Sequence, residues 1–270
     1  MDTIQNDVSD EALVTGIRAN MCDFFRHTSR SNPAEHLENE QFTRWHTSLP
    51  HPWFNGVLSS NPPMDGDESF IDATIKYFRL KGTNTFTWWM EPDLKPSDWE
   101  PALSGYGFGF SDDTPGMAID LHEMNASMQP TDGFEIRVVA DEESLHTWAK
   151  VFLSGYGLPP NWESIAFDLW TQLGLNFPIR NYLGYLNGEP VATSTVFYGG
   201  GTAGIYCVAT LPEARGKGIG GAITLKPLQD AREMGYRVGV LQSSEMGYSV
   251  YKKLGFRHLC QIESFYLSLP

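Results

Sequence analysis

The chain has few basic side chains and few cysteines. Its 270 residues include 19 Lys and Arg against 33 Asp and Glu, which gives a formal net charge of −14 at pH 7. Nucleic acids and anionic membranes are bound mainly through Lys and Arg, so neither is an expected partner. The three cysteines, Cys22, Cys207 and Cys260, lie far apart, and no CxxC or Cys/His cluster occurs. Neither a disulfide framework nor a metal site is therefore predicted.

Long apolar runs are also absent. The longest uncharged stretch, 190–212, is rich in Thr and Ser and contains Gly199-Gly200-Gly201 at its centre. A membrane span is more uniformly apolar, so this stretch favours two strands joined by a turn. The first residues, MDTIQNDVSDE, are polar and acidic where a secretory signal is basic and then apolar. We therefore expect a cytoplasmic protein.

What the chain does contain is enough apolar sequence for a large core. Hydrophobic residues make up 41% and aromatic residues 13%, and the length suits one large domain or two of about 135 residues. Residues 1–130 carry 8 basic and 20 acidic side chains, a net charge of −12, whereas 131–270 carry 11 and 13, a net charge of −2. The turn-rich segment 125–133 (NASMQPTDG) is a candidate linker. Two domains, 1–128 and 129–270, are predicted.

Both halves show the same order of predicted elements, ending in a helix, Gly-Phe and a strand. The segment FTWWMEPDLKPSDWEPALSGYGF in the first half parallels VGVLQSSEMGYSVYKKLGF in the second. Hydrophobic spacing predicts helices over 10–28, 69–80, 142–156, 162–173, 217–234 and 245–254. It predicts strands over 53–59, 85–90, 117–121, 134–139, 181–186, 190–198, 203–210, 236–242 and 257–267. These patterns indicate a duplicated α/β unit.

The most informative segment is 205–221, IYCVATLPEARGKGIGG, in which a strand leads through a glycine-rich turn into a helix. The amides of Gly216 to Gly221 lie at the predicted start of that helix, where the helix dipole adds partial positive charge. Glycine also lets an anion approach the backbone closely. This combination predicts a site for a phosphate, most naturally a pyrophosphate.

Two other interpretations of this turn are open. It can be a glycine-rich connection without a ligand. Gly216, Gly218 and Gly221 also fit the GxGxxG pattern of dinucleotide-binding folds. That fingerprint includes an acidic residue about 20 positions later, and here 240–243 is Val-Leu-Gln-Ser. The turn also lies too late in the chain for a full dinucleotide-binding sheet to follow.

A third interpretation rests on a resemblance. Arg215-x-x-Gly218-x-Gly220, after the strand 205–210, resembles the acetyl-CoA pyrophosphate loop of the GCN5-related N-acetyltransferases. The run 208–215 is similar to that family as well. The segment 251–256, Tyr-Lys-Lys-Leu-Gly-Phe, resembles its Tyr-x-x-x-Gly-Phe motif. The similarity covers about residues 134–270. One departure is Ser244, at a position where family members often carry Asn.

The resemblance implies an α/β fold of tandem acetyltransferase-like domains, each a central, mostly antiparallel sheet flanked by helices. It implies acetyl-CoA as co-substrate, with its pantetheine arm against backbone groups of Val208 and Thr210. The amide of Val208 would stabilise the developing oxyanion. Tyr251 would be the general acid that protonates the departing thiolate. The remaining implied acetyl-CoA contacts are Arg215, Gly216, Lys217, Gly218, Ile219, Gly220, Gly221 and Ser244.

The implied reaction is direct attack of a primary amine, carried by a small molecule or a peptide, on the acetyl group. The acids Glu163, Asp168 and Glu245 and the imidazole of His146 are typical of solvated helix faces, so no general base is assigned. The alternative is a protein that binds or senses acyl-CoA without turnover. The sequence leaves the acceptor open, and it does not distinguish a monomer from a homodimer.

The first half resembles a degenerate copy of the second. If Gly107-Phe108 matches Gly255-Phe256, then Leu103 stands where the second half has Tyr251. The segment 60–68, in the place of the phosphate loop, contains two prolines without amide donors and three acids: Pro62, Pro63, Asp65, Asp67 and Glu68. We therefore expect one working site, in the second half, and one acetyl-CoA per chain.

Overall fold

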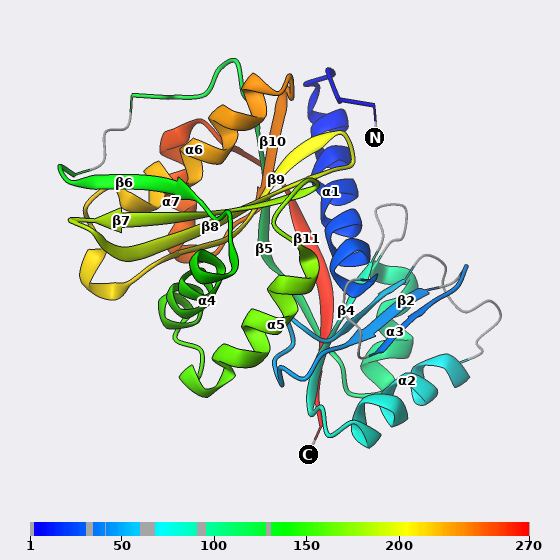
Figure 1. Ribbon diagram of the computed structural model, residues 1–270. Coiled ribbons are helices and arrows are strands. Elements are labelled where there is room, and N and C mark those ends of the chain that lie inside the picture. The colour runs from blue at the N-terminus through cyan, green and yellow to red at the C-terminus, as the bar shows by residue number, and fades with distance from the viewer. Residues whose placement is uncertain are drawn as a thin grey trace. The chain divides into compact units, whose positions relative to one another are not determined.

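The computed structural model describes residues 3–30, 35–40, 42–59, 68–90, 96–127 and 131–269 (Figure 1). The chain forms two compact units, each made of two segments. Unit 1 contains Met1–Phe24 and Pro115–Cys260, and unit 2 contains Phe25–Thr114 and Gln261–Pro270.

Unit 1 is built on a mixed sheet with the strand order β5-β10-β9-β8-β7-β6. Only the pair β10–β9 is parallel, and the other pairs are antiparallel. The strands are β5 (Gly109–Asp120, from Pro115 onward), β6 (Phe134–Val138), β7 (Ile179–Leu186), β8 (Glu189–Gly199), β9 (Thr202–Thr210) and β10 (Val238–Gln242). The helices are α1 (Asp10–Arg30, as far as Phe24), α4 (Glu142–Tyr156), α5 (Glu163–Leu173), α6 (Ile219–Glu233) and α7 (Glu245–Leu254), with the short turns η2 (Pro160–Trp162) and η3 (Pro212–Ala214).

The helices of unit 1 have clear sequence signals at their ends. The Asp141 side chain accepts a hydrogen bond from the Ser144 amide at the start of α4, and Gly157 ends that helix with φ +67°. Gly255 ends α7 in the same left-handed region, with φ +107°. Helices α4 and α6 both pack on β8 and β9, from opposite faces of the sheet (Figure 1).

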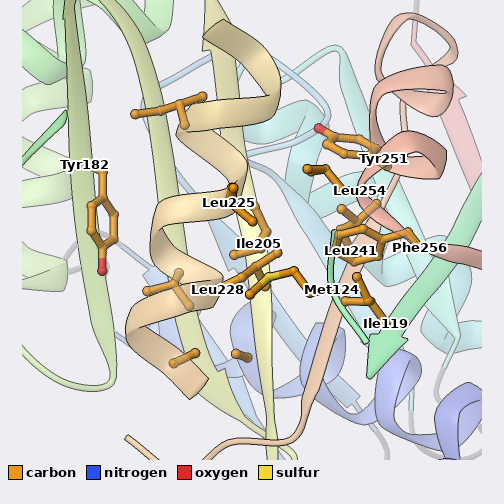
Figure 2. Close-up of a cluster of buried hydrophobic side chains, with 14 of the residues drawn as sticks. Ile119, Met124, Tyr182, Ile205, Leu225, Leu228, Leu241, Tyr251, Leu254 and Phe256 are labelled. Atoms are coloured by element: carbon orange, nitrogen blue, oxygen red, sulfur yellow. The ribbon is translucent and has the colours of Figure 1, made fainter. Parts of the chain in front are cut away.

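The core of unit 1 lies between the sheet and the helices α6 and α7. Figure 2 shows Ile205 of β9 beside Leu225 and Leu228 of α6, with Leu241 of β10 near Phe256. Other buried members are Met117, Ile119, Leu121, Met124, Tyr182, Val196, Ile219, Ile223, Tyr251 and Leu254.

Unit 2 has the strand order β1-β2-β3-β4-β11, in which β3 and β4 are parallel and the other pairs antiparallel. Its strands are β1 (Glu35–Glu38), β2 (Phe42–His46), β3 (Gly56–Ser59), β4 (Thr85–Met90) and the later part of β11 (Arg257–Ser268), and its helices are α2 (Ser69–Leu80) and α3 (Pro96–Gly105). Aromatic rings dominate the core. Phe78 stacks on Phe86 at 4.0 Å between ring centroids, and the buried Trp88 donates its indole hydrogen to the Ser59 hydroxyl at 2.7 Å.

The two units exchange strands along the chain. In unit 1, residues Gly116–Asp120 of β5 come from the first half and pair with β10. In unit 2, residues Ser264–Ser268 of β11 come from the end of the chain and pair with β4. Each sheet is therefore completed by a strand from the other half of the sequence.

The amino-terminal residues also belong to unit 1. The Gln5 amide donates to the Gly201 carbonyl at 3.0 Å, and the Gly200 amide donates to Asp23 Oδ2 at 2.8 Å. A Cβ on Gly200 would lie 2.8 Å from the Asn20 nitrogen, so the β8–β9 turn fits closely against α1.

These compact units differ from the division into 1–128 and 129–270, which treats each half as self-contained. Hydrophobic patterns locate strands, but they do not record which strand pairs with which. The proposed boundary itself, at 128–130, lies outside the described residues. The end of the preceding segment is held in unit 1, since the Asn125 amide donates to the Leu254 carbonyl at 2.9 Å.

The predicted fold class, a mixed α/β fold with mostly antiparallel sheets flanked by helices, is confirmed. Among the described helices, none has the length and apolar character needed to cross a bilayer.

Candidate functional site

Strands β9 and β10 are paired along only part of their length. Their parallel register joins Gly239 to Ala203, Val240 to Gly204 and Leu241 to Ile205, and the recorded pairing ends there. Both strands are fully described, and β9 continues for five more residues to Thr210. Because β10 no longer pairs with it, this part of β9 has an unpaired edge on that side.

A β-bulge lies within the unpaired part of β9. On the neighbouring strand β8, Thr193 faces Ala209 and Thr195 faces Tyr206, so the single residue Ser194 lies opposite two residues of β9, Cys207 and Val208. Bulges of this kind turn backbone and side chains out of the regular alternation and occur often beside active sites.

Cys207 has the backbone conformation that forms this bulge. Its φ is +52°, which is unusual for a residue with a Cβ. The Thr193 hydroxyl donates to the Cys207 carbonyl at 2.8 Å and holds the conformation. Burial raises the pKa of the Cys207 thiol to about 12, so this cysteine stays protonated at neutral pH.

The glycine-rich turn places a series of backbone amides at the start of α6. Gly216 and Gly218 have φ of +76° and +75°, the left-handed region that glycine adopts at little cost. Gly216, Lys217 and Gly218 are exposed, and a Cβ at Gly216 would meet nothing within 4 Å. The amides of 216–221 have no acceptor among the described residues. This arrangement matches the predicted anion site.

The two basic side chains of the turn bond to the protein itself. Arg215 Nε donates to the Thr210 carbonyl and its NH2 group to the Gly155 carbonyl, both at 3.0 Å. Lys217 Nζ donates to the Glu213 carbonyl at 3.1 Å. Arg215 therefore ties the turn to the end of β9 and to α4.

Some of the residues that were predicted to contact acetyl-CoA after the turn are buried in unit 1. Ile219, the first residue of α6, is 1% exposed and packs in the core, so only its backbone is available to a ligand. Gly221 is also buried, and Gly220 is partly buried. The Ser244 hydroxyl accepts from the Gly247 amide at 3.2 Å and caps α7, which is a structural use for this side chain.

Tyr251 lies on α7 with 8% of its surface exposed. Gly247, one turn earlier, allows this position, since a Cβ there would come within 2.6 Å of the Tyr251 ring. The hydroxyl has no hydrogen-bond partner among the described residues, and in Figure 2 it points from α7 toward the side of α6. Burial raises the pKa of Tyr251 to about 12, so the hydroxyl keeps its proton at neutral pH.

A second tyrosine near this position was not found from the sequence. Tyr156 ends α4, and its pKa is raised well above the usual value first by burial and then by the nearby Cys207 and Tyr251. Its side chain nevertheless keeps 37% of its surface exposed. A helix-terminal tyrosine carries no sequence signal of this proximity, because Cys207 and Tyr251 follow 51 and 95 positions later.

Among the acids considered as general bases, Glu163 is engaged by two other side chains. Glu163 pairs with His146 at 3.0 Å and with Lys150 at 3.4 Å. The general base stays unassigned.

In unit 2, Leu103 of α3 is fully buried in the aromatic core and has no group that could donate a proton. Of the predicted acidic loop, 60–67 lies outside the described residues. Glu68 is described and precedes α2 without a side-chain capping bond.

Solved structures define the class of this fold. A GCN5-related N-acetyltransferase from Kribbella flavida superposes with a TM-score of 0.62 at 17% identity, over 93% of this chain and 95% of that one. A tandem GNAT protein from the clavulanic acid biosynthesis pathway gives 0.59 at 13% identity, over 99% and 97%. A functionally unknown conserved protein from Staphylococcus epidermidis gives 0.61 at 14% identity, over 87% and 93%. At these identities the likeness establishes the fold alone, which this chain shares with a tandem GNAT protein.

The family follows from the second half of the sequence. Residues 143–256 match the model of the acetyltransferase (GNAT) family, and the matched range includes β9, the glycine-rich turn and Tyr251. The segment 143–256 is therefore a GNAT-family domain, as the sequence motifs predicted. Membership supports acetyl transfer as the general activity. No curated protein matches the chain in sequence.

Proposed function

We propose that the protein transfers the acetyl group of acetyl-CoA to a primary amine at the unpaired edge of β9. The observation that carries the proposal is the convergence on one unit of three features. These are the edge and bulge of β9, the amides of 216–221, which have no acceptor among the described residues, and the buried, protonated Tyr251. Each supplies a different requirement of the reaction.

Binding would use backbone groups. The amides of 216–221 would hold the pyrophosphate at the positive end of α6, with Arg215 and Lys217 adding charge. The edge of β9 at Val208 and Thr210 would pair with the amide groups of the pantetheine arm. In this proposal Gly220 and Gly221 contribute through the backbone and Ser244 through its position at the start of α7.

In the chemical step, the amine nitrogen forms a bond to the acetyl carbon while the carbon–sulfur bond breaks. The Val208 amide would donate to the carbonyl oxygen as negative charge develops there, an interaction commonly worth about 3 kcal/mol. Tyr251 would give its proton to the departing sulfur, and the new ammonium group would release a proton to solvent or to a base. Proton donation of this kind is typically worth about 10²- to 10⁴-fold in rate.

The acceptor would be a small-molecule or peptide amine, acetylated by a monomer or homodimer in the cytoplasm. None of the cysteines, all of which are described, forms a disulfide, which fits a reducing compartment.

The deciding experiment is a panel of amines, namely polyamines, amino acids, aminoglycoside-like compounds and peptides, assayed by release of the CoA thiol. Tyr251→Phe should lower kcat by at least tenfold while the calorimetric Kd for CoA stays within twofold. Tyr248→Phe, which removes a hydroxyl from the same helix one turn earlier, is the control and should leave kcat unchanged. Tight CoA binding without transfer to any amine would favour the alternative of an acyl-CoA-binding or sensing protein.

A further inference from the structure

The amino-terminal helix α1 reaches β9 immediately before its bulge. Asn20 on this helix is fully buried, and its Nδ2 group donates to the carbonyls of Phe197, Gly199 and Thr202 at 3.3, 2.8 and 3.3 Å. Its Oδ1 atom accepts from the Tyr206 hydroxyl at 2.7 Å. A single side chain thus connects both strands of the β8–β9 hairpin to Tyr206.

The slot that receives Asn20 is closely fitted. A Cβ at Gly204 would lie 1.9 Å from Asn20 Oδ1, so only glycine is compatible with this contact. One helical turn later, Phe24 stacks on the Tyr206 ring at 3.9 Å between centroids, with an angle of 8° between the rings. The Tyr206 side chain is therefore fixed both at its ring and at its hydroxyl.

Tyr206 is the last residue of β9 before the bulge. It faces Thr195 in regular register, and the next residue, Cys207, has the φ of +52°. On the far side of the irregularity, Ala209 faces Thr193, whose hydroxyl holds the Cys207 carbonyl. The bulge is thus anchored at Tyr206 by α1 and at the Cys207 carbonyl by β8, and the Val208 amide belongs to the peptide group of that carbonyl.

We infer that Asn20 and Tyr206 are positioning residues for acetyl transfer: through their hydrogen bond, α1 sets the direction of the Val208 amide. This inference rests on the proposed function, in which that amide meets the thioester oxygen. Neither side chain contacts the reacting atoms. Because the Val208 amide acts on the charge that develops in the transition state, loss of the anchor should lower kcat more than it weakens acetyl-CoA binding.

Tyr206→Phe is the sharpest test, because it keeps the ring stacked on Phe24 and removes only the hydroxyl. We expect kcat to fall about five- to tenfold, the effect of one good hydrogen bond, with the KM for acetyl-CoA within twofold. Tyr198→Phe is the matched control. The Tyr198 hydroxyl lies buried in β8 of the same sheet and has no partner among the described residues, so its removal should leave kcat unchanged.

Asn20→Ala should lower kcat at least as much, and the double variant with Tyr206→Phe should be no slower than Asn20→Ala alone, because both remove the same bond. Independent effects of the two substitutions on kcat would overturn the inference. An equal loss of kcat and of acetyl-CoA affinity would also overturn it, since that pattern indicates general damage to the unit. Assays are run well below the unfolding temperature of each variant.

Amide hydrogen exchange tests the positioning without any turnover. Exchange at the amides of β9 and β8 that are hydrogen-bonded on either side of the bulge should rise about fivefold in Tyr206→Phe and in Asn20→Ala and stay unchanged in Tyr198→Phe. Unchanged exchange in all three variants refutes the anchor, even if the wild-type enzyme acetylates amines. If exchange rises in the two anchor variants but the wild-type protein acetylates no amine, the proposed reaction is refuted and the anchor is still supported.

Discussion

Removal of residues 1–128 should abolish independent folding of the second half, although that half contains the complete GNAT family match. The fragment 129–270 lacks Gly116–Asp120, the strand that pairs with β10 along five register positions. It also lacks α1, which fits against the β8–β9 turn. Without these elements β10 has an unpaired edge, and part of the core of unit 1 is exposed.

The size of the loss follows from burial. Met117, Ile119 and Leu121 are 0%, 2% and 0% exposed and belong to the same core cluster as Tyr251. Burying a side chain of this size contributes about 1.5–3 kcal/mol, so the three together contribute about 5–9 kcal/mol. The free energy of unfolding of a typical domain is about 5–15 kcal/mol, so the loss is comparable to the whole.

The assay is thermal unfolding by circular dichroism, together with CoA titration, on 129–260 and 115–260. The two fragments differ only by 115–128, which brings the part of β5 that pairs with β10 and the segment that follows it. We expect a cooperative transition and CoA binding only in the longer fragment, and both should improve when residues 3–24 are supplied as a peptide. A cooperative transition and CoA binding in 129–260 would refute the reasoning.

Three further predictions concern the site. Burial raises the pKa of Tyr251 to about 12, so a general acid at this position stays protonated well above pH 10. In a kcat profile measured to pH 10.5, we therefore expect no fall with an apparent pKa near 10, the value of an unburied tyrosine. A fall near pH 10 that disappears in Tyr251→Phe would contradict this. Calorimetry should show that each chain binds one CoA, and Gly218→Asp should weaken this binding at least tenfold. Gly235→Asp is the control, because it puts the same side chain at the other end of α6, also at positive φ, and it should bind CoA as the wild type does. Two sites per chain, or one site that survives Gly218→Asp, would place the site elsewhere. The net charge of −12 on residues 1–130 predicts a cationic acceptor, and anionic amines that outperform polyamines in the panel would rule this out.

Much of the second half could be predicted because its signals are local. The expected helices 142–156 and 245–254 agree with α4 and α7 at both ends, where Asp141, Gly157 and Gly255 supply the capping signals. The glycine-rich turn and Tyr251 were singled out as site candidates for the same reason, since each lies in a short motif whose residues are near one another in sequence.

The first half was predicted less completely. Strands β1 and β2 were missed, because 35–46 contains acids and polar residues that interrupt the alternation expected for a strand. Strand β5 starts eight residues earlier than the predicted strand 117–121.

In the second half, the bulge at Cys207 has no sequence signal, because the residue that adopts positive φ is neither Gly nor Asn.

The exchange of strands explains how the first half can serve the site without a site of its own. Leu103 offers no proton, yet the same half supplies β5, whose Met117 and Ile119 pack in the core that holds Tyr251. It also supplies Asn20, whose bond to Tyr206 precedes the bulge. None of these contributions depends on a phosphate loop, so substitutions that abolish ligand binding in the first half leave them intact. Substitutions that break the β5–β10 pairing would instead affect the second half directly. In the proposed reaction, the first half would therefore contribute through the strand and the helix that it supplies to unit 1.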